Sequence, residues 1–219
     1  MTSASKIALG FSGLAGGSGM GVGGLYLSSK EDILSKVKDD VLGTETEFNS
    51  SWKSQFKKLS TENKKIPKDL EKLKSITEEN QQISAIKGWC SSAYTTTYKS
   101  IFSSKKEELL DIVRKYCIQS LKEKLTDSIT GSSKVLSVTD ETDKQEFINN
   151  YKKLKDHNST QDGKLDSTLS AFDATKAESE SQTKWSSLRD WCKEALTKSF
   201  KGESDDLFKT SKKFCVKQN

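Results

Sequence analysis

Two stretches of the chain carry the same pattern, and this pattern decides the fold. Leu188–Val216 reads LRDWCKEALTKSFKGESDDLFKTSKKFCV, and Ile86–Ile118 reads IKGWCSSAYTTTYKSIFSSKKEELLDIVRKYCI. Each stretch contains a Trp-Cys pair, followed by a cysteine that comes directly after another aromatic residue. The two copies account for all four cysteines of the chain, which are Cys90, Cys117, Cys192 and Cys215.

The sequence before each copy also repeats, which indicates two related units. Phe56–Asn63 reads FKKLSTEN, and Tyr151–Asn158 reads YKKLKDHN. A long period that occurs twice is typical of duplicated domains, because a solenoid needs three or more units. We therefore divide the chain into a leader, residues 1–30, and two units that we call repeat 1, residues 31–130, and repeat 2, residues 131–219.

Apolar residues within both repeats recur with a helical period. Phe48, Trp52 and Phe56 are spaced four apart in repeat 1, and Phe147 and Tyr151 have the same spacing in repeat 2. This spacing predicts amphipathic helices, and the near absence of proline agrees with it.

The predicted fold is therefore all-α. It consists of a membrane-type helix in the leader and two tandem-repeat helical bundles, each with a Cys-linked antiparallel helical hairpin. The short run KVLSVT, Lys134–Thr139, has strand-like composition. We assign this run to the joint between the repeats.

The cysteine spacing predicts the hairpin in each repeat. In repeat 1, Ser104 and Glu107 match a capping box that starts a helix, which puts a turn midway between Cys90 and Cys117. Residues equally far from such a turn lie at the same height, so the two cysteines can come within disulfide distance.

The same reasoning applies to repeat 2. Gly202 is typical of the end of a helix and Ser204 of the start of the next one, so a turn falls between the two cysteines. Buried free thiols are an alternative, because duplication alone could preserve the spacing. A metal site is a weaker alternative, since no short C-x₂₋₄-C knuckle is present. Of three possible connectivities, the one that treats the repeats alike is Cys90–Cys117 and Cys192–Cys215.

Trp89 and Trp191 directly precede the first cysteine of each pair. We interpret both as structural aromatic residues, because a large ring beside a bridge commonly packs over it as core. A ligand platform formed by the two indoles is the alternative.

The leader has no charged residue between Ile7 and Ser28. As a helix this stretch would be about 33 Å long, enough to cross a hydrocarbon core of about 30 Å. It is either an uncleaved membrane anchor or a cleaved signal peptide, and the lack of an Ala-x-Ala site favours the anchor. The larger apolar residues of this membrane segment are Ile7, Leu9, Phe11, Leu14, Val22, Leu25 and Leu27.

Charge and motifs argue against two classes of function. Residues 31–219 carry 34 basic and 31 acidic groups, and only Arg114 and Arg189 are arginine. This balance argues against nucleic acid as a partner, which calls for a clustered basic patch. His157 is the only histidine and has no catalytic motif around it. We therefore expect no enzymatic activity and no cofactor, and we identify no metal ligand and no small-molecule substrate.

The stretch MTSASKIALGFSGLAGGSGMGVGG, Met1–Gly24, precedes a Lys/Ser/Thr-rich body with repeated Trp-Cys and aromatic-Cys pairs. This combination resembles the paralogous uncharacterised surface proteins of haemotropic mycoplasmas, with most of the likeness in about the first 30 residues. The resemblance implies a member of an expanded family at the cell membrane, with roles in host-cell contact or antigenic variation and with host surfaces or antibodies as partners.

The leader and the predicted disulfides together place the helical body outside the cell, since disulfides persist in oxidising compartments. The alternative is an exported or cytosolic enzyme or ligand-binding module whose site matches no motif.

Overall fold

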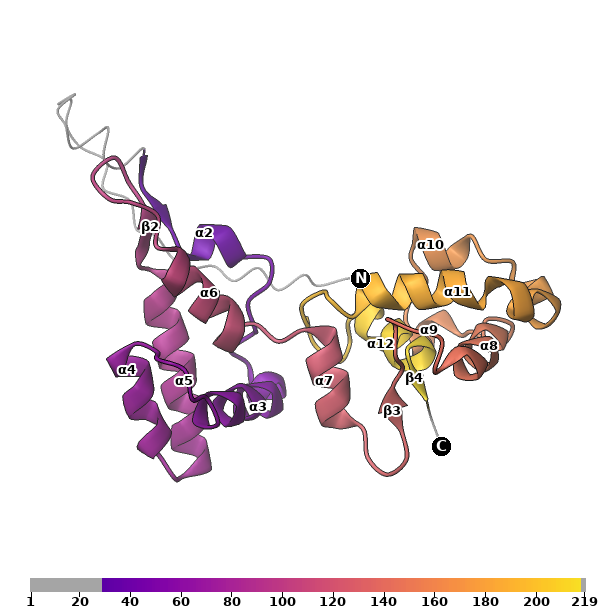
Figure 1. Cartoon of the computed structure of the whole chain (residues 1–219), viewed down its shortest axis with the longest axis horizontal. Coiled ribbons are helices and arrows are strands. Elements are labelled where there is room, and N and C mark those ends of the chain that lie inside the picture. Colours follow the sequence, from indigo (N-terminus) through magenta and orange to yellow (C-terminus); the bar gives the residue numbers. More distant parts are fainter. Residues whose placement is uncertain (1–28, 218–219) are drawn as a thin grey trace.

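The computed structural model describes residues 29–217, so the predicted membrane segment of the leader lies outside the described residues. The described chain is mainly helical, with most helices of repeat 1 at one end of the long axis and those of repeat 2 at the other (Figure 1). The helices of repeat 1 are α2 (Leu34–Val37), α3 (Asn49–Ser60), α4 (Lys68–Glu71), α5 (Glu79–Tyr94), α6 (Glu107–Tyr116) and α7 (Leu121–Ser128).

Repeat 2 has a similar order of long and short helices. Short 3-10 turns occur in both repeats, at Thr46–Phe48, Lys72–Ser75 and Ala174–Lys176. No helix between residues 29 and 217 has the length and apolar character that crossing a bilayer requires. The helices of repeat 2 are α8 (Lys144–Lys152), α9 (Ser159–Asp162), α10 (Ser167–Ser170), α11 (Ala177–Ala195) and α12 (Asp206–Phe214).

The first long helix of each repeat buries the apolar face that the sequence predicts. In repeat 1, Trp52, Phe56 and Leu59 of α3 are buried, and α3 packs against α5 and α6. In repeat 2, Phe147 and Tyr151 of α8 are buried, and α8 lies along α11. Burial of one face of an amphipathic helix supplies the hydrophobic contribution that its own propensity lacks.

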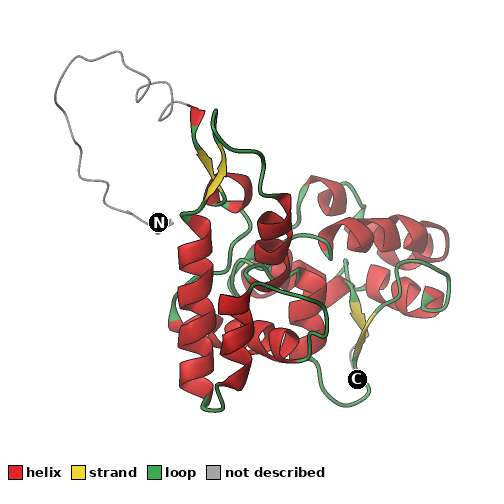
Figure 2. Cartoon of the chain, turned by 60° about the vertical axis from the view of Figure 1, so that its left-hand side comes forward, coloured by secondary structure: helices red, strands yellow, loops and turns green. Residues whose placement is uncertain are grey.

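The all-α prediction misses two short antiparallel ribbons, which Figure 2 shows in yellow. One ribbon joins β1 (Glu31–Asp32) to β2 (Thr97–Lys99), and the other joins β3 (Lys134–Val135) to β4 (Val216–Lys217). Strands of two or three residues are too short to show alternation, and their pairing joins segments that are far apart in the sequence.

The assignment of KVLSVT to the joint was therefore wrong in part. Val135 pairs with Val216, and the N–H of Leu136 donates to the carbonyl of Cys215 at 2.9 Å. In repeat 1 the N–H of Leu42 donates in the same way to the carbonyl of Cys117, at 3.3 Å. In each repeat, a segment ahead of the first long helix is therefore hydrogen-bonded to the second cysteine of that repeat.

Two predicted helix starts are also corrected. The capping box of Ser104 and Glu107 does not form: α6 begins at Glu107, whose carboxylate accepts a hydrogen bond from the Tyr98 hydroxyl at 2.6 Å. The cap of α12 is Asp205 rather than Ser204, and its side chain accepts from the N–H of Phe208 at 3.0 Å. A tertiary contact takes the side chain of Glu107, and an aspartate competes with the serine as a cap.

The two repeats meet along α7 and the loop before α12. In this junction the N–H of Leu121 donates to the carbonyl of Lys198 and the N–H of Phe200 to the carbonyl of Gln119, each at 2.8 Å. Phe200 is buried, with its ring 5.7 Å from that of Phe48. Because α7 also contacts β3 and α12, it lies between the repeats, and the boundary at residue 130 stays a prediction.

Candidate functional site

Two disulfides lie at corresponding places in the two repeats. In repeat 1, Cys90 of α5 is bonded to Cys117, directly after α6, with 5.8 Å between the Cα atoms. In repeat 2, Cys192 of α11 is bonded to Cys215, directly after α12, with 5.6 Å between the Cα atoms. All four cysteines are buried, and the pairing is the one that the spacing predicts.

The chain reversal between the cysteines of repeat 1 also lies close to the predicted place. The backbone N–H of Ser100 donates to the carbonyl of Ser103, and that of Ser103 to the carbonyl of Ser100, at 3.4 and 3.3 Å. This turn is nearly midway between Cys90 and Cys117, so the two cysteines lie at similar heights on neighbouring helices. Closing a loop of this length stabilises a domain by about 3–4 kcal/mol.

A buried amide side chain in each repeat bonds to the backbone next to the second cysteine. The Gln55 amide donates to the carbonyl of Ile118 at 3.0 Å, and the Asn150 amide donates to the carbonyls of Phe214 and Val216 at 2.9 and 3.1 Å. Neither amide is among the residues predicted from the sequence. The available signal was that each amide stands one residue before the repeated aromatic-Lys-Lys-Leu motif.

A lysine and an acidic residue also pair in each repeat. Lys115, two residues before Cys117, pairs with Glu62, and Lys213, two residues before Cys215, pairs with Asp162 at 2.5 Å. The hydrogen bond from Lys115 lowers the pKa of Glu62 to about 2, with further donors at the Lys64 N–H and the Tyr116 hydroxyl. These pairs tie the segment after the first long helix of each repeat to the helix that ends just before the second cysteine.

Each of the predicted structural tryptophans contacts an aspartate of a short helix. Trp191 is buried, and its indole N–H donates to the Asp166 carboxylate at 2.7 Å. Trp89 is half-buried, and its indole N–H donates to Asp69 at 2.9 Å. The indole N–H of Trp191 therefore links α11 to the start of α10, and that of Trp89 links α5 to α4. Packing of the two rings over the bridges stays a prediction.

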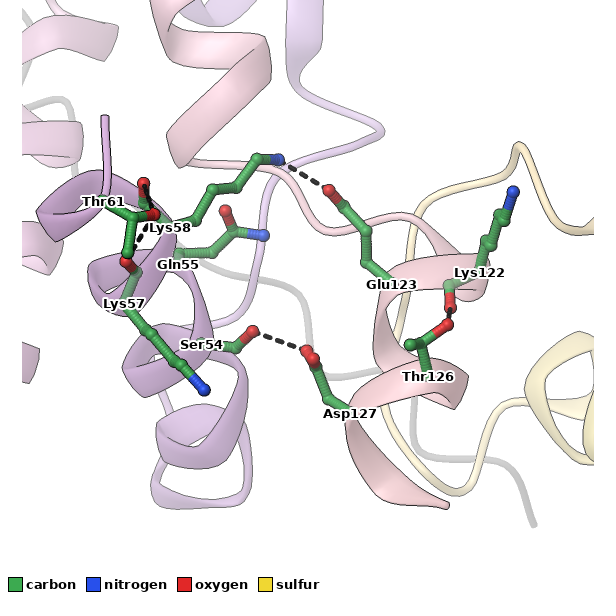
Figure 3. Close-up of a pocket in the computed structure, with 9 residues that line it drawn as sticks. All are labelled: Ser54, Gln55, Lys57, Lys58, Thr61, Lys122, Glu123, Thr126 and Asp127. Atoms are coloured by element: carbon green, nitrogen blue, oxygen red, sulfur yellow. Dashed lines mark hydrogen bonds and ion pairs between the residues drawn. The ribbon is translucent and has the colours of Figure 1, made fainter. Parts of the chain in front are cut away.

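A groove lies between α3 and α7 (Figure 3). Its volume is about 450 Å³. The lining is polar and charged, with residues from both helices: Ser54, Gln55, Lys57, Lys58, Thr61, Lys122, Glu123, Thr126 and Asp127.

The two carboxylates that line this α3–α7 groove, those of Glu123 and Asp127, bond to side chains of α3 on the opposite wall. Lys58 pairs with Glu123 at 2.6 Å, and the Ser54 hydroxyl donates to Asp127 at 2.5 Å (Figure 3). Burial acts to raise the pKa of Glu123, but the hydrogen bonds from Lys58 and from Ser120 together outweigh it, and the pKa is lowered. Both contacts join α3 of repeat 1 to α7, so they contribute to the junction between the repeats.

The groove brings together cations, hydroxyls and paired carboxylates, but neither histidine nor cysteine lines it. Within residues 29–217 no group of three or more His, Cys, Asp or Glu side chains is arranged to hold a metal ion. The single histidine, His157, stacks on Phe214 with 5.9 Å between ring centroids, and its Nε2 lies 2.9 Å from the Gly163 carbonyl.

No family model, no curated protein and no solved structure matches this chain.

Proposed function

We propose that the chain is a membrane-anchored surface protein. Its two disulfide-linked helical repeats would lie outside the cell, where they would serve host-cell contact or display to antibodies. The leader is the anchor in this proposal, and the protein has no catalytic role, no cofactor and no nucleic-acid partner.

The pair of buried disulfides is the observation that supports this proposal most. Disulfides of this kind persist in oxidising compartments and are rare in the cytosol. Only 32% of the residues are hydrophobic, so each repeat has a thin core and gains a large share of its stability from its bridge. A helical body that depends on two disulfides for its stability is expected in an oxidising compartment, such as the outside of the cell.

The contacts around each bridge add a second argument. The charged side chains next to the bridges pair internally, and the indoles hold short helices in place. Such contacts preserve a scaffold while leaving the outer lysine-rich, glutamate-rich and serine-rich surface free to vary. A constant frame with a variable surface suits recognition of a host or display to antibodies.

Protease shaving of cells that make the protein tests the placement. Trypsin added to intact cells is expected to digest the repeats, as seen on a reducing gel, while a cytosolic marker stays intact. Mass mapping of cysteines alkylated before lysis is expected to find Cys90, Cys117, Cys192 and Cys215 blocked as disulfides. Repeats that resist trypsin until lysis, or that carry four alkylated thiols, would contradict the proposal.

The alternative is a ligand-binding module, which the α3–α7 groove favours. Lys57 and Lys122 lie on its two walls, and neither forms an ion pair within residues 29–217. An anionic ligand would therefore meet two cations. A rise in melting temperature with a small anion, lost in the Lys57→Ser, Lys122→Ser variant, would support this alternative, and no rise with any anion would count against it.

A further inference from the structure

Two neighbouring apolar side chains stand out on the surface of repeat 1. Among residues 29–217, the large hydrophobic side chains that are mostly exposed are Ile101, at 53%, and Phe102, at 68%. They belong to the four-residue turn Ser100–Ser103, which we call the tip. Adjacent exposed apolar residues at one projecting turn are typical of an interaction site.

The tip is a hydrogen-bonded turn at the end of a two-stranded ribbon. Glu31 of β1 pairs with Lys99 of β2 just before it, and the Ser100 and Ser103 hydroxyls lie 2.9 Å apart. The N–H of Phe102 also donates to the Ser100 hydroxyl, at 3.2 Å. The ribbon carries the tip beyond the ends of α5 and α6 (Figures 1 and 2). The fold therefore presents the two apolar residues at one extremity of repeat 1.

In repeat 2 the turn at the aligned position packs against a neighbouring unit. When the two repeats are aligned on Cys117 and Cys215, Phe102 corresponds to Phe200, because each phenylalanine stands 15 residues before its cysteine. Phe200 is only 1% exposed and packs on Phe48 of repeat 1. In repeat 2 the aligned loop is thus a docking element that inserts an aromatic ring into the preceding unit.

The unit that precedes repeat 1 is the leader. The Ile101 N–H donates to the Ser29 hydroxyl at 3.3 Å, so the tip lies beside the residue at which the uncharged stretch Ile7–Ser28 joins the body. With the leader in a bilayer, this contact holds the tip at the membrane surface.

The charges around the tip fit an anionic surface. Lys99, Lys105 and Lys106 flank it, and residues 99–106 include no acidic residue. Glu31, the nearest acid on the ribbon, pairs with Lys36. Lysines beside exposed apolar side chains are the usual composition of segments that lie in the headgroup region of a membrane.

We infer that the tip is a membrane-surface contact, in which Ile101 and Phe102 insert at the headgroup boundary and the flanking lysines face anionic phosphates. The inference rests on the proposed anchoring of the leader and adds a second point of attachment. Two attachments would fix the orientation of repeat 1 relative to the bilayer, whereas a single tether would leave it free to rotate.

Site-specific photo-crosslinking of the full-length chain tests this. Benzoylphenylalanine replaces Phe102 in one variant and Ala171, an exposed residue of repeat 2, in the control. Both are reconstituted in vesicles of phosphatidylcholine and phosphatidylglycerol and irradiated. Lipid adducts are expected at position 102 and not at position 171.

The possible negative results distinguish a failure of the proposed anchoring from a failure of the tip contact. A chain that does not float with the vesicles overturns the anchoring and the tip contact together. A chain that floats but gives no lipid adduct at position 102 overturns the tip contact alone. An adduct joining two chains at position 102 also overturns it, and would show that a second copy occupies the tip.

A binding measurement isolates the contribution of the tip. In a full-length chain whose leader carries Phe11→Asp and Leu14→Asp, binding to the same vesicles should depend on the tip. Adding Ile101→Ser and Phe102→Ser is expected to lower the partition coefficient about tenfold, and to change the melting temperature little because both side chains are mostly exposed. Equal partition coefficients with and without these two changes would contradict the inference.

Discussion

Asn150 shows how much a single buried side chain contributes to repeat 2. It is 2% exposed, and its amide satisfies two carbonyls, one on each side of Cys215. A buried carbonyl that loses its hydrogen-bond donor cannot bond to water instead, and this destabilises the fold by about 1–3 kcal/mol.

We predict that Asn150→Ala lowers the free energy of unfolding by about 2–4 kcal/mol, because it leaves two carbonyls without this donor. Urea unfolding of the oxidised protein measures the loss. Asn149→Ala is the matched control, since Asn149 is exposed on the same helix and should change stability by less than about 0.5 kcal/mol. Similar losses in both variants would mean that the buried amide has no special role.

The lowered pKa of Glu62 predicts that the stability of the protein depends on pH. The hydrogen bond from Lys115 lowers its pKa from 4.5 to about 2 in the folded state. A carboxyl whose pKa is lowered by folding stabilises the fold above its unfolded pKa, and this contribution is lost as the pH falls from about 4.5 towards 2.

We therefore expect Glu62→Gln to have a lower melting temperature than the wild type at pH 7, with the difference shrinking as the pH falls to about 2. Melting curves at intervals between these values measure it. Glu71→Gln, at an exposed position in α4, is the control and should follow the wild type throughout. A difference that stays constant with pH would rule out an ionic contribution from Glu62.

Among the helices, α10 is held by one residue, Asp166, through two different contacts. Its carboxylate caps α10 by accepting from the N–H groups of Thr168 and Leu169, and it also accepts the indole N–H of Trp191. The short helix α10 thus depends on one residue both for its start and for its attachment to α11.

The two tasks can be separated by a pair of variants. Asp166→Ala loses both contacts and is expected to cost about 2–4 kcal/mol, with faster hydrogen exchange at Thr168 and Leu169. Trp191→Phe keeps most of the buried ring and the cap, so it should cost about 1–3 kcal/mol and leave those amides protected. Equal exchange in both variants would show that the cap does not hold α10.

The contact between the repeats depends on the loop that carries Phe200. This ring lies 5.7 Å from Phe48 and 5.0 Å from Phe208, with the Lys124 ammonium 4.9 Å from its centroid. It therefore joins residues of repeat 1, of repeat 2 and of α7 between them.

We predict that Phe200→Ala lowers the free energy of unfolding by about 3 kcal/mol or more and loosens the junction. Urea unfolding measures the first effect, and an increase in the radius of gyration by small-angle scattering measures the second. Phe102→Ala is the matched control, because this aligned residue is 68% exposed, and it should cost less than about 0.5 kcal/mol. A low cost for Phe200→Ala would mean that the repeats are held mainly by the backbone contacts of α7.

Several features of this protein could be predicted from its sequence because they depend on local spacing. The helical period predicts the buried faces of α3 and α8, and the distance of each cysteine from the chain reversal predicts the two bridges. Helix starts were less predictable, since Glu107 is bonded to the Tyr98 hydroxyl instead of forming the local cap.

The tertiary structure alone decided what lies beside each segment. Val135 and Val216 are adjacent only because the ends of repeat 2 come together in space. Phe102 and Phe200 occupy aligned positions, yet one is exposed and the other is buried. Periodicity and spacing describe each repeat by itself, whereas the burial of an aromatic ring depends on whether a neighbouring unit covers it, and that is set by how the repeats pack.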